Sequence, residues 1–116
     1  MVIFKEFRFE AAHRLPNVPK QHKCHNLHGH NYRVRVEVTG ELDPVLGWVI
    51  EFAFIDCAAG VVKQLVDHKY LNDVKGLENP TAEIIAEWIL KTLRATILNV
   101  TSVTVWETDD CGAVAE

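Results

Sequence analysis

The sequence lacks the features that mark membrane, secreted or nucleic-acid-binding proteins. Its 116 residues contain no apolar run long enough to span a membrane, and the N-terminus has no signal-peptide pattern. The net charge is −4, which argues against nucleic acid or a membrane surface as a partner. The only cysteines, Cys24, Cys57 and Cys111, show no Cys-x-x-Cys spacing. We therefore expect reduced thiols, no disulfide and a cytoplasmic location.

Internal repeats, low-complexity tracts and linkers are also missing, so we expect a single domain over residues 1–116. Residues 2–10, 28–39 and 101–108 alternate apolar with polar side chains, which predicts strands that are buried on one face. The tail from Cys111 either adds a short fourth strand or stays loose. The predicted order is β-β-α-α-β-β, an α+β fold with an antiparallel sheet and two helices on one face.

Two segments have the apolar spacing of helices. The second helix should begin after Thr81, which can cap it, and its buried face should consist of Ile84, Ile85, Trp88, Ile89 and Leu93. The first helix should cover residues 54–66, with an apolar stripe made of Phe54, Cys57, Ala58, Val61, Val62 and Leu65. Because Cys57 lies on this stripe, we interpret it as a small core residue.

Three histidines are placed to meet at one end of the sheet. His28 and His30 share a face at the start of their strand, and His13 continues the inward parity of the first strand. If these strands pair antiparallel, His13 arrives beside the other two. Three imidazoles leave one position of a tetrahedron open, which is typical of a catalytic zinc site. In the alternative interpretation, His28 and His30 merely line a polar strand end.

Two further residues stand out from the pattern. Cys24 lies in a loop, residues 14–27, that is longer than an ordinary hairpin connection, and such loops are usually functional. Glu107 shares the parity of Val103 and Val105 at a strand end, where a carboxylate is out of pattern. It is either a frayed end that meets water or a functional group.

Several short motifs, in order along almost the whole chain, resemble the 6-pyruvoyl-tetrahydropterin synthase family. They are Phe9–Leu15 (Phe-Glu-Ala-Ala-His-Arg-Leu), Cys24–His30 (Cys-x-x-x-His-Gly-His), Asp67-His68 before Tyr70-Leu71-Asn72, Glu78–Thr81 and Glu107-Thr108. The three-residue gap between Cys24 and His28 favours the bacterial 6-carboxy-tetrahydropterin branch, which acts in queuosine biosynthesis. Two positions depart from the family pattern. Glu51 stands where relatives often have aspartate, and Lys69 stands where close relatives often have a second histidine.

The resemblance implies a tunnelling fold, in which subunits join their sheets edge to edge into a barrel. Trimers of this kind commonly stack in pairs, so a homohexamer is expected, with active sites built from more than one subunit. The implied reaction converts 7,8-dihydroneopterin triphosphate to 6-carboxy-tetrahydropterin, acetaldehyde and triphosphate. One alternative is the 6-pyruvoyl reaction, which removes triphosphate without cleaving the side chain. Another is a non-catalytic zinc-binding module.

The resemblance also implies roles for individual residues. His13, His28 and His30 hold Zn²⁺, and Cys24 accepts a proton from the substrate. His68 relays protons with Asp67, which either faces it through the local backbone geometry or orients it only through another subunit. Glu107 anchors the pterin ring and shares in the relay, and Thr81 adds substrate contacts. Arg14, Lys20 and Lys23 either hold the triphosphate or are simply solvated loop residues.

Overall fold

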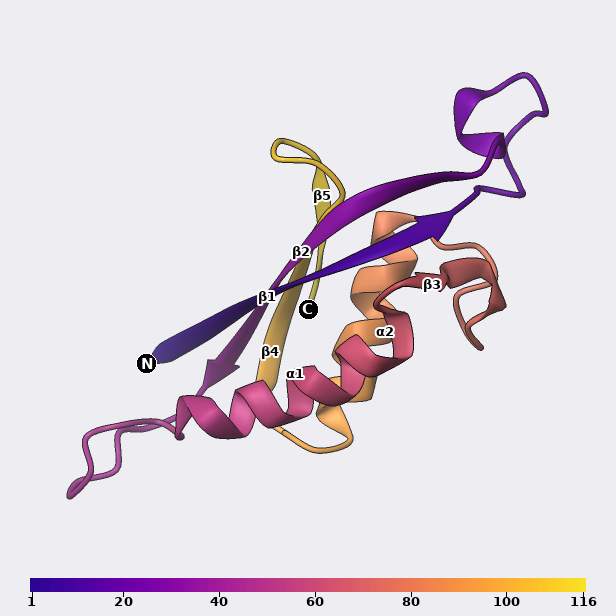
Figure 1. The fold of residues 1–116 in the computed structure, drawn as a ribbon. Helices are drawn as coiled ribbons and strands as arrows, with labels where there is room; N and C mark the ends of the chain where they lie inside the picture. The colour runs from indigo at the N-terminus through magenta and orange to yellow at the C-terminus, as the bar shows by residue number, and fades with distance from the viewer.

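The computed structural model describes all 116 residues and consists of one five-stranded sheet with two long helices (Figure 1). The strands are β1 (Val2–His13), β2 (His28–Thr39), β3 (Lys69–Tyr70), β4 (Val100–Trp106) and β5 (Gly112–Ala115). The helices are α1 (Phe52–Val66) and α2 (Ala82–Arg94). The sheet order is β3-β1-β2-β4-β5, and all neighbours are antiparallel except β3 and β1.

The predicted α+β fold is confirmed, with one addition. The two-residue strand β3, between the helices, was not predicted, because two residues are too few to show an alternating pattern. The tail forms a strand, β5, which resolves the alternative left open by the sequence. Neither helix has both the length and the apolar composition that a bilayer crossing requires.

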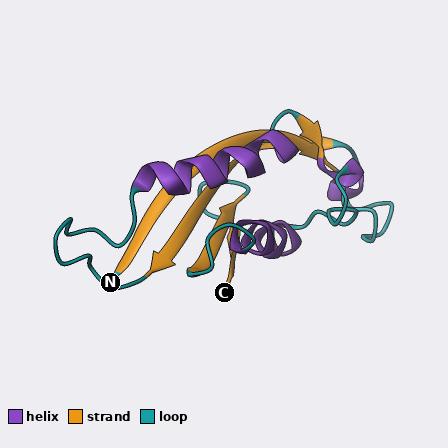
Figure 2. Ribbon diagram, turned by 90° about the horizontal axis from the view of Figure 1, so that it is seen from below, coloured by secondary structure: helices purple, strands orange, loops and turns teal.

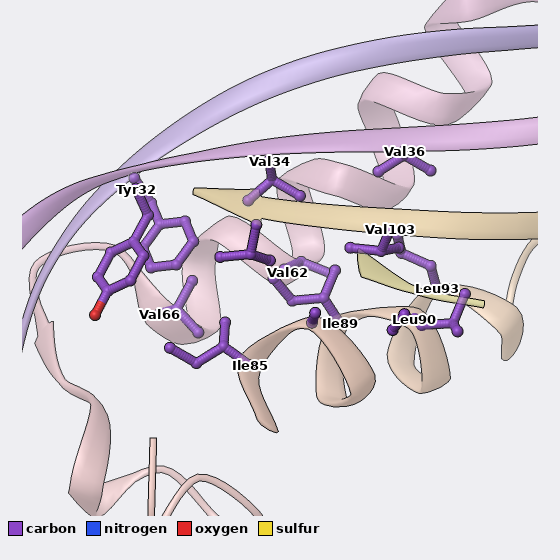
Figure 3. Packing of buried hydrophobic residues seen from close by; sticks show 14 of the residues in the cluster. Tyr32, Val34, Val36, Val62, Val66, Ile85, Ile89, Leu90, Leu93 and Val103 are labelled. Atoms are coloured by element: carbon purple, nitrogen blue, oxygen red, sulfur yellow. The ribbon is translucent and has the colours of Figure 1, made fainter. Parts of the chain in front are cut away.

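Both helices pack against the same face of the twisted sheet (Figure 2). The alternation of β2 turns Tyr32, Val34, Val36 and Val38 toward them, and all four side chains are fully buried. Figure 3 shows the first three of these strand residues, Tyr32, Val34 and Val36, with Val62 and Val66 of α1 and the apolar side chains of α2 below the strands. The Thr81 side chain accepts a hydrogen bond from the Ile84 amide at 3.2 Å, so the predicted cap of α2 is confirmed.

The predicted buried stripe of α1 is wrong at four of its six positions. The buried residues are Ile55, Ala58, Ala59, Val62 and Val66, whereas Phe54, Cys57, Val61 and Leu65 are exposed. Helix α1 carries two adjacent apolar stripes, and spacing alone cannot choose between them. The structure buries the stripe with two alanines, whose small side chains let the helix lie close to the sheet. Cys57 is therefore a surface thiol and not a core residue.

The long β1–β2 hairpin determines which residues meet at its open end. Its register pairs His13 with His28 and Ala11 with His30. On the outer side of β1, β3 pairs only with Ala11 and Ala12. The backbone ahead of Glu10 on this outer edge has no strand beside it within the chain.

Candidate metal and pterin site

Three histidine rings converge at the end of the β1–β2 hairpin, on the face that the helices cover. The ring nitrogens that could bind a metal all lie within 4.8 Å of one another. The ring centroids of His13, His28 and His30 are separated by 4.5 to 5.1 Å, and the rings stand edge to face. The predicted convergence of the three imidazoles is therefore present in the structure.

Backbone carbonyls determine which nitrogens are free in two of these rings. The Nδ1 of His13 lies 2.8 Å from the Pro80 carbonyl oxygen, and the Nδ1 of His28 lies 2.8 Å from that of Asn26. A carbonyl can only accept, so each Nδ1 carries the hydrogen and donates it. Each neutral ring then presents a bare Nε2. Hydrogen bonds of this kind are the usual support of histidines that bind metals.

The two bare nitrogens face each other at close range. The Nε2 atoms of His13 and His28 are 3.0 Å apart. Two lone pairs at this distance repel unless a cation lies between them, and two nitrogens on one tetrahedral zinc would be about 3.3 Å apart. With His30 as the third nitrogen, the donor set fits Zn²⁺, which accepts three imidazoles plus one further ligand.

Burial keeps two rings of the triad, His13 and His30, in the neutral form that binds metals. His13 is 1% exposed, and this burial lowers its pKa to about 4, assisted by the neighbouring His28 and His30 and opposed by the Pro80 carbonyl. Burial also lowers the pKa of His30. At neutral pH, protons therefore compete weakly for these nitrogens.

Tyr32 belongs to the site, although the sequence motifs did not single it out. Its hydroxyl lies 3.1 Å from Nδ1 of His13, and its ring stacks on Phe9 at 4.7 Å. Burial raises the pKa of Tyr32 and keeps the hydroxyl protonated. The available signal was its parity, because Tyr32 follows His28 and His30 on the same face of β2.

Glu107 and Thr81 lie close to the triad. The β2–β4 register pairs Arg33 with Trp106, which places Glu107 beside Tyr32. Burial lowers the pKa of His30, and the negative charge of Glu107 partly opposes this shift, so the carboxylate lies within electrostatic range of the ring. Thr81 follows Pro80, whose carbonyl accepts the hydrogen bond from His13. The end of β4 and the start of α2 therefore both border the histidines.

Cys24 lies in a short 3-10 turn, Lys23–His25, in the loop between β1 and β2. It is half-buried, and its carbonyl accepts a hydrogen bond from the Leu15 amide at 2.8 Å, which ties down the loop. Its thiol makes no hydrogen bond to Asp67, His68 or Glu107 within the chain.

Asp67 and His68 form a pair at the outer edge of β1. Oδ1 of Asp67 lies 3.0 Å from Nδ1 of His68, although the residues are adjacent in sequence. His68 has a φ of 57°, a left-handed conformation that turns its side chain back toward Asp67. Of the two alternatives for this pair, the structure therefore shows local backbone geometry.

Glu10 completes this cluster, although the sequence indicated no role for it beyond its place in the Phe9–Leu15 motif. Its backbone amide donates to Oδ1 of Asp67 at 3.0 Å, and its carbonyl accepts from the His68 amide at 2.6 Å. Its carboxylate lies 3.6 Å from Nε2 of His68, so the imidazole has an acid on either side. The Glu10 amide and then His68 lower the pKa of Asp67, which stays ionised.

These observations define a class of protein: an α+β sheet backed by two helices, with three histidines able to hold a metal at one end. The sequence profile described as 6-pyruvoyl tetrahydropterin synthase matches residues 2–116. The chain belongs to the 6-pyruvoyl tetrahydropterin synthase family, as its motifs predicted.

The chain is similar to relatives that have different enzyme names. The chain is 43% identical to the 6-carboxy-5,6,7,8-tetrahydropterin synthase of Synechocystis, with 92% of this chain and 86% of that protein covered. It is 34% identical to the dihydroneopterin monophosphate aldolase of Pyrococcus furiosus, with coverages of 93% and 90%. The structure of Caenorhabditis elegans 6-pyruvoyl tetrahydropterin synthase superimposes with a TM-score of 0.93 at 28% identity, covering 100% of this chain and 94% of that one. These relatives support the prediction of an enzyme, and the superposition confirms the fold.

Proposed function

We propose that this chain is a 6-carboxy-5,6,7,8-tetrahydropterin synthase that acts in the cytoplasm, in queuosine biosynthesis. Its substrate would be 7,8-dihydroneopterin triphosphate, and the products would be 6-carboxy-tetrahydropterin, acetaldehyde and triphosphate. The observation that carries the proposal is the triad itself, in which two bare Nε2 atoms face each other at 3.0 Å beside Glu107. The similarity to the Synechocystis enzyme supports this choice among the activities of the family.

His13, His28 and His30 would hold Zn²⁺ through ring nitrogens that are fixed by backbone carbonyls and burial. When bound, the metal ion supplies a Lewis acid that lowers the pKa of the substrate's side-chain hydroxyl groups. The protein's own contribution is to hold three nitrogen donors in place and to leave room for one oxygen ligand.

Glu107 would hold the pterin ring. A carboxylate can accept two parallel hydrogen bonds, here from the ring's amino group and the adjacent N–H. This contact fixes which way the substrate's side chain extends from the ring. Thr81, at the start of α2, would add a contact through its hydroxyl or backbone on the same side.

Cys24 would accept a proton from a side-chain carbon as a thiolate, and His68 would carry protons to and from the substrate, oriented by Asp67. The thiol of Cys24 makes no hydrogen bond to this pair within one chain. We therefore propose that a second copy brings its Asp67–His68 pair to each Cys24, in a homohexamer of single-domain subunits. No nucleic acid or membrane partner is required.

Product analysis tests the proposal. The wild-type protein, incubated with 7,8-dihydroneopterin triphosphate, should release acetaldehyde and triphosphate in equal amounts. Triphosphate without acetaldehyde would instead identify the 6-pyruvoyl reaction, the activity of the Caenorhabditis elegans enzyme.

Two variants test whether the metal site is catalytic. Cys24→Ala should keep zinc and the fold but lose turnover, whereas a non-catalytic zinc module would be unaffected by this change. His28→Ala should lose zinc by elemental analysis. His25→Ala, which removes an imidazole outside the triad, is the matched control and should keep its zinc.

A further inference from the structure

Three cationic side chains from three different elements surround the Asp67–His68 pair. Arg8 of β1 and Lys63 of α1 line a hollow of about 360 Å³ together with Asp67 and His68. Lys69 of β3 borders a hollow of about 520 Å³ that also contains His68. A third hollow, of about 310 Å³, has both Lys63 and Lys69 in its wall. The three hollows share lining residues and adjoin one another, and we refer to them together as the depression around the pair.

The carboxylates in this depression are already engaged. Asp67 and Glu10 both contact the His68 ring, at 3.0 and 3.6 Å. No carboxylate oxygen lies within 4.0 Å of the charged groups of Arg8, Lys63 or Lys69, although other cations of the sheet have such partners. The depression therefore presents three cations that form no ion pair within the chain, although the charge of Lys63 contributes to lowering the pKa of Asp67.

The position of Arg8 is unfavourable for stability. It lies directly opposite Arg33 in the β1–β2 register, and like charges in this position destabilise a sheet. Arg33 is compensated by Glu6 at 3.5 Å and by the Trp106 ring at 3.9 Å. Arg8 has no such compensation, so its placement favours a bound anion over a structural role.

We infer that Arg8, Lys63 and Lys69 form an anion subsite for the triphosphate of the substrate, an inference that rests on the proposed function. The triphosphate of 7,8-dihydroneopterin triphosphate is attached to the end of a three-carbon side chain. If His68 exchanges protons with that side chain, the triphosphate lies next to His68. Lys69 is adjacent to His68 in sequence and lines the same hollow.

A second set of cations, Arg14, Lys20 and Lys23 in the β1–β2 loop, is the alternative binding site for the triphosphate. The two sets lie on different elements and can be tested separately.

Binding of inorganic triphosphate to the purified, full-length protein, measured by isothermal titration calorimetry, tests the subsite without requiring turnover. Arg8→Gln, Lys63→Gln and Lys69→Gln should each raise the Kd about fivefold to tenfold, since each removes one charge-assisted contact. Lys69→Arg should keep the affinity because it keeps the charge. Lys91→Gln removes an exposed charge from α2 and should leave the Kd unchanged.

Two results would overturn the inference: no saturable binding to the wild-type protein, or a Kd that responds to Arg14→Gln, Lys20→Gln and Lys23→Gln but not to the three depression variants. Its failure can be distinguished from failure of the proposed function. Acetaldehyde release with a Kd that is insensitive to Lys69 rejects only the subsite. A Kd that is sensitive to Lys69, without acetaldehyde release, rejects only the reaction.

Discussion

The carbonyl oxygen of Pro80 lies 2.8 Å from Nδ1 of His13, so the loop that precedes α2 orients a ring at the end of β1. This contact joins residues 67 positions apart, and it determines which nitrogen of His13 is available. The candidate metal site therefore depends on the packing of α2 as well as on the hairpin that carries its histidines.

Thr81→Ala should weaken both the helix and the site. The variant loses the hydrogen bond to the Ile84 amide, which should lower the free energy of unfolding by about 1 kcal/mol. Because Thr81 follows Pro80, loosening of this turn should also lower zinc affinity. Urea unfolding and chelator competition measure the two effects. Thr81→Ser keeps the capping hydroxyl and should restore both; an unaltered affinity in the alanine variant would show that the cap does not position Pro80.

Tyr32→Phe should lower zinc affinity up to about tenfold, toward the small end of the range for residues that support a metal ligand. The variant removes the hydroxyl 3.1 Å from Nδ1 of His13 and keeps the ring that stacks on Phe9. Competition with a fluorescent chelator measures the change. Tyr70→Phe removes the other tyrosine hydroxyl of the chain, which makes no hydrogen bond to a histidine of the triad, and should bind zinc like the wild type. Equal affinities for both variants would contradict the role of Tyr32.

Acid should destabilise the metal-free protein before its carboxylates titrate. His13 has a pKa of about 4 in the folded chain and about 6.5 when unfolded, so between these values the unfolded chain binds more protons. The contribution of neutral His13 to the free energy of unfolding is complete above pH 6.5 and is lost as the pH falls toward 4. The free energy of unfolding should fall by about 1 kcal/mol between pH 7 and pH 5.5.

Urea titrations in the presence of a chelator measure this pH dependence. The matched variant is His13→Gln, which cannot titrate and should give a shallower slope over the same range. A slope that is the same in both proteins would assign the effect to other groups.

Two neighbouring valines test which face of α1 is buried. Val62 is fully buried and Val61 is 56% exposed. Val62→Ala should lower the free energy of unfolding by about 2 kcal/mol because it leaves a cavity in the core. Val61→Ala makes the same chemical change on the exposed face and should cost less than about 0.5 kcal/mol. Thermal or urea unfolding measures both losses in stability. A larger loss for Val61→Ala than for Val62→Ala would show that the stripe predicted from the sequence is the buried one.

The features that the sequence predicted correctly depend on regular spacing. The alternation in β1 and β2 is unbroken, so the meeting of His13 with His28 follows from the pairing of two strands. Which face of α1 is buried could not be predicted, because both of its stripes are apolar and only packing against the sheet distinguishes them. The contact of Asp67 with His68 depends on one left-handed residue, for which a histidine gives no signal.

The roles of Glu10 and Pro80 could not be predicted either, because each depends on a contact between elements far apart in the chain. Glu10 meets His68 across 58 residues of sequence, and Pro80 meets His13 across 67. Spacing patterns describe single elements, and they do not report which loop ends beside which strand.

The outer edge of β1 has a further consequence for how the protein is handled. Ahead of Glu10 its amides and carbonyls face outward with no neighbouring strand in the chain, and β3 is too short to cover them. A bare edge of this length is a template on which any extended polypeptide can add. If another copy occupies that edge, the melting temperature should rise with protein concentration, and dilute samples should unfold first on heating.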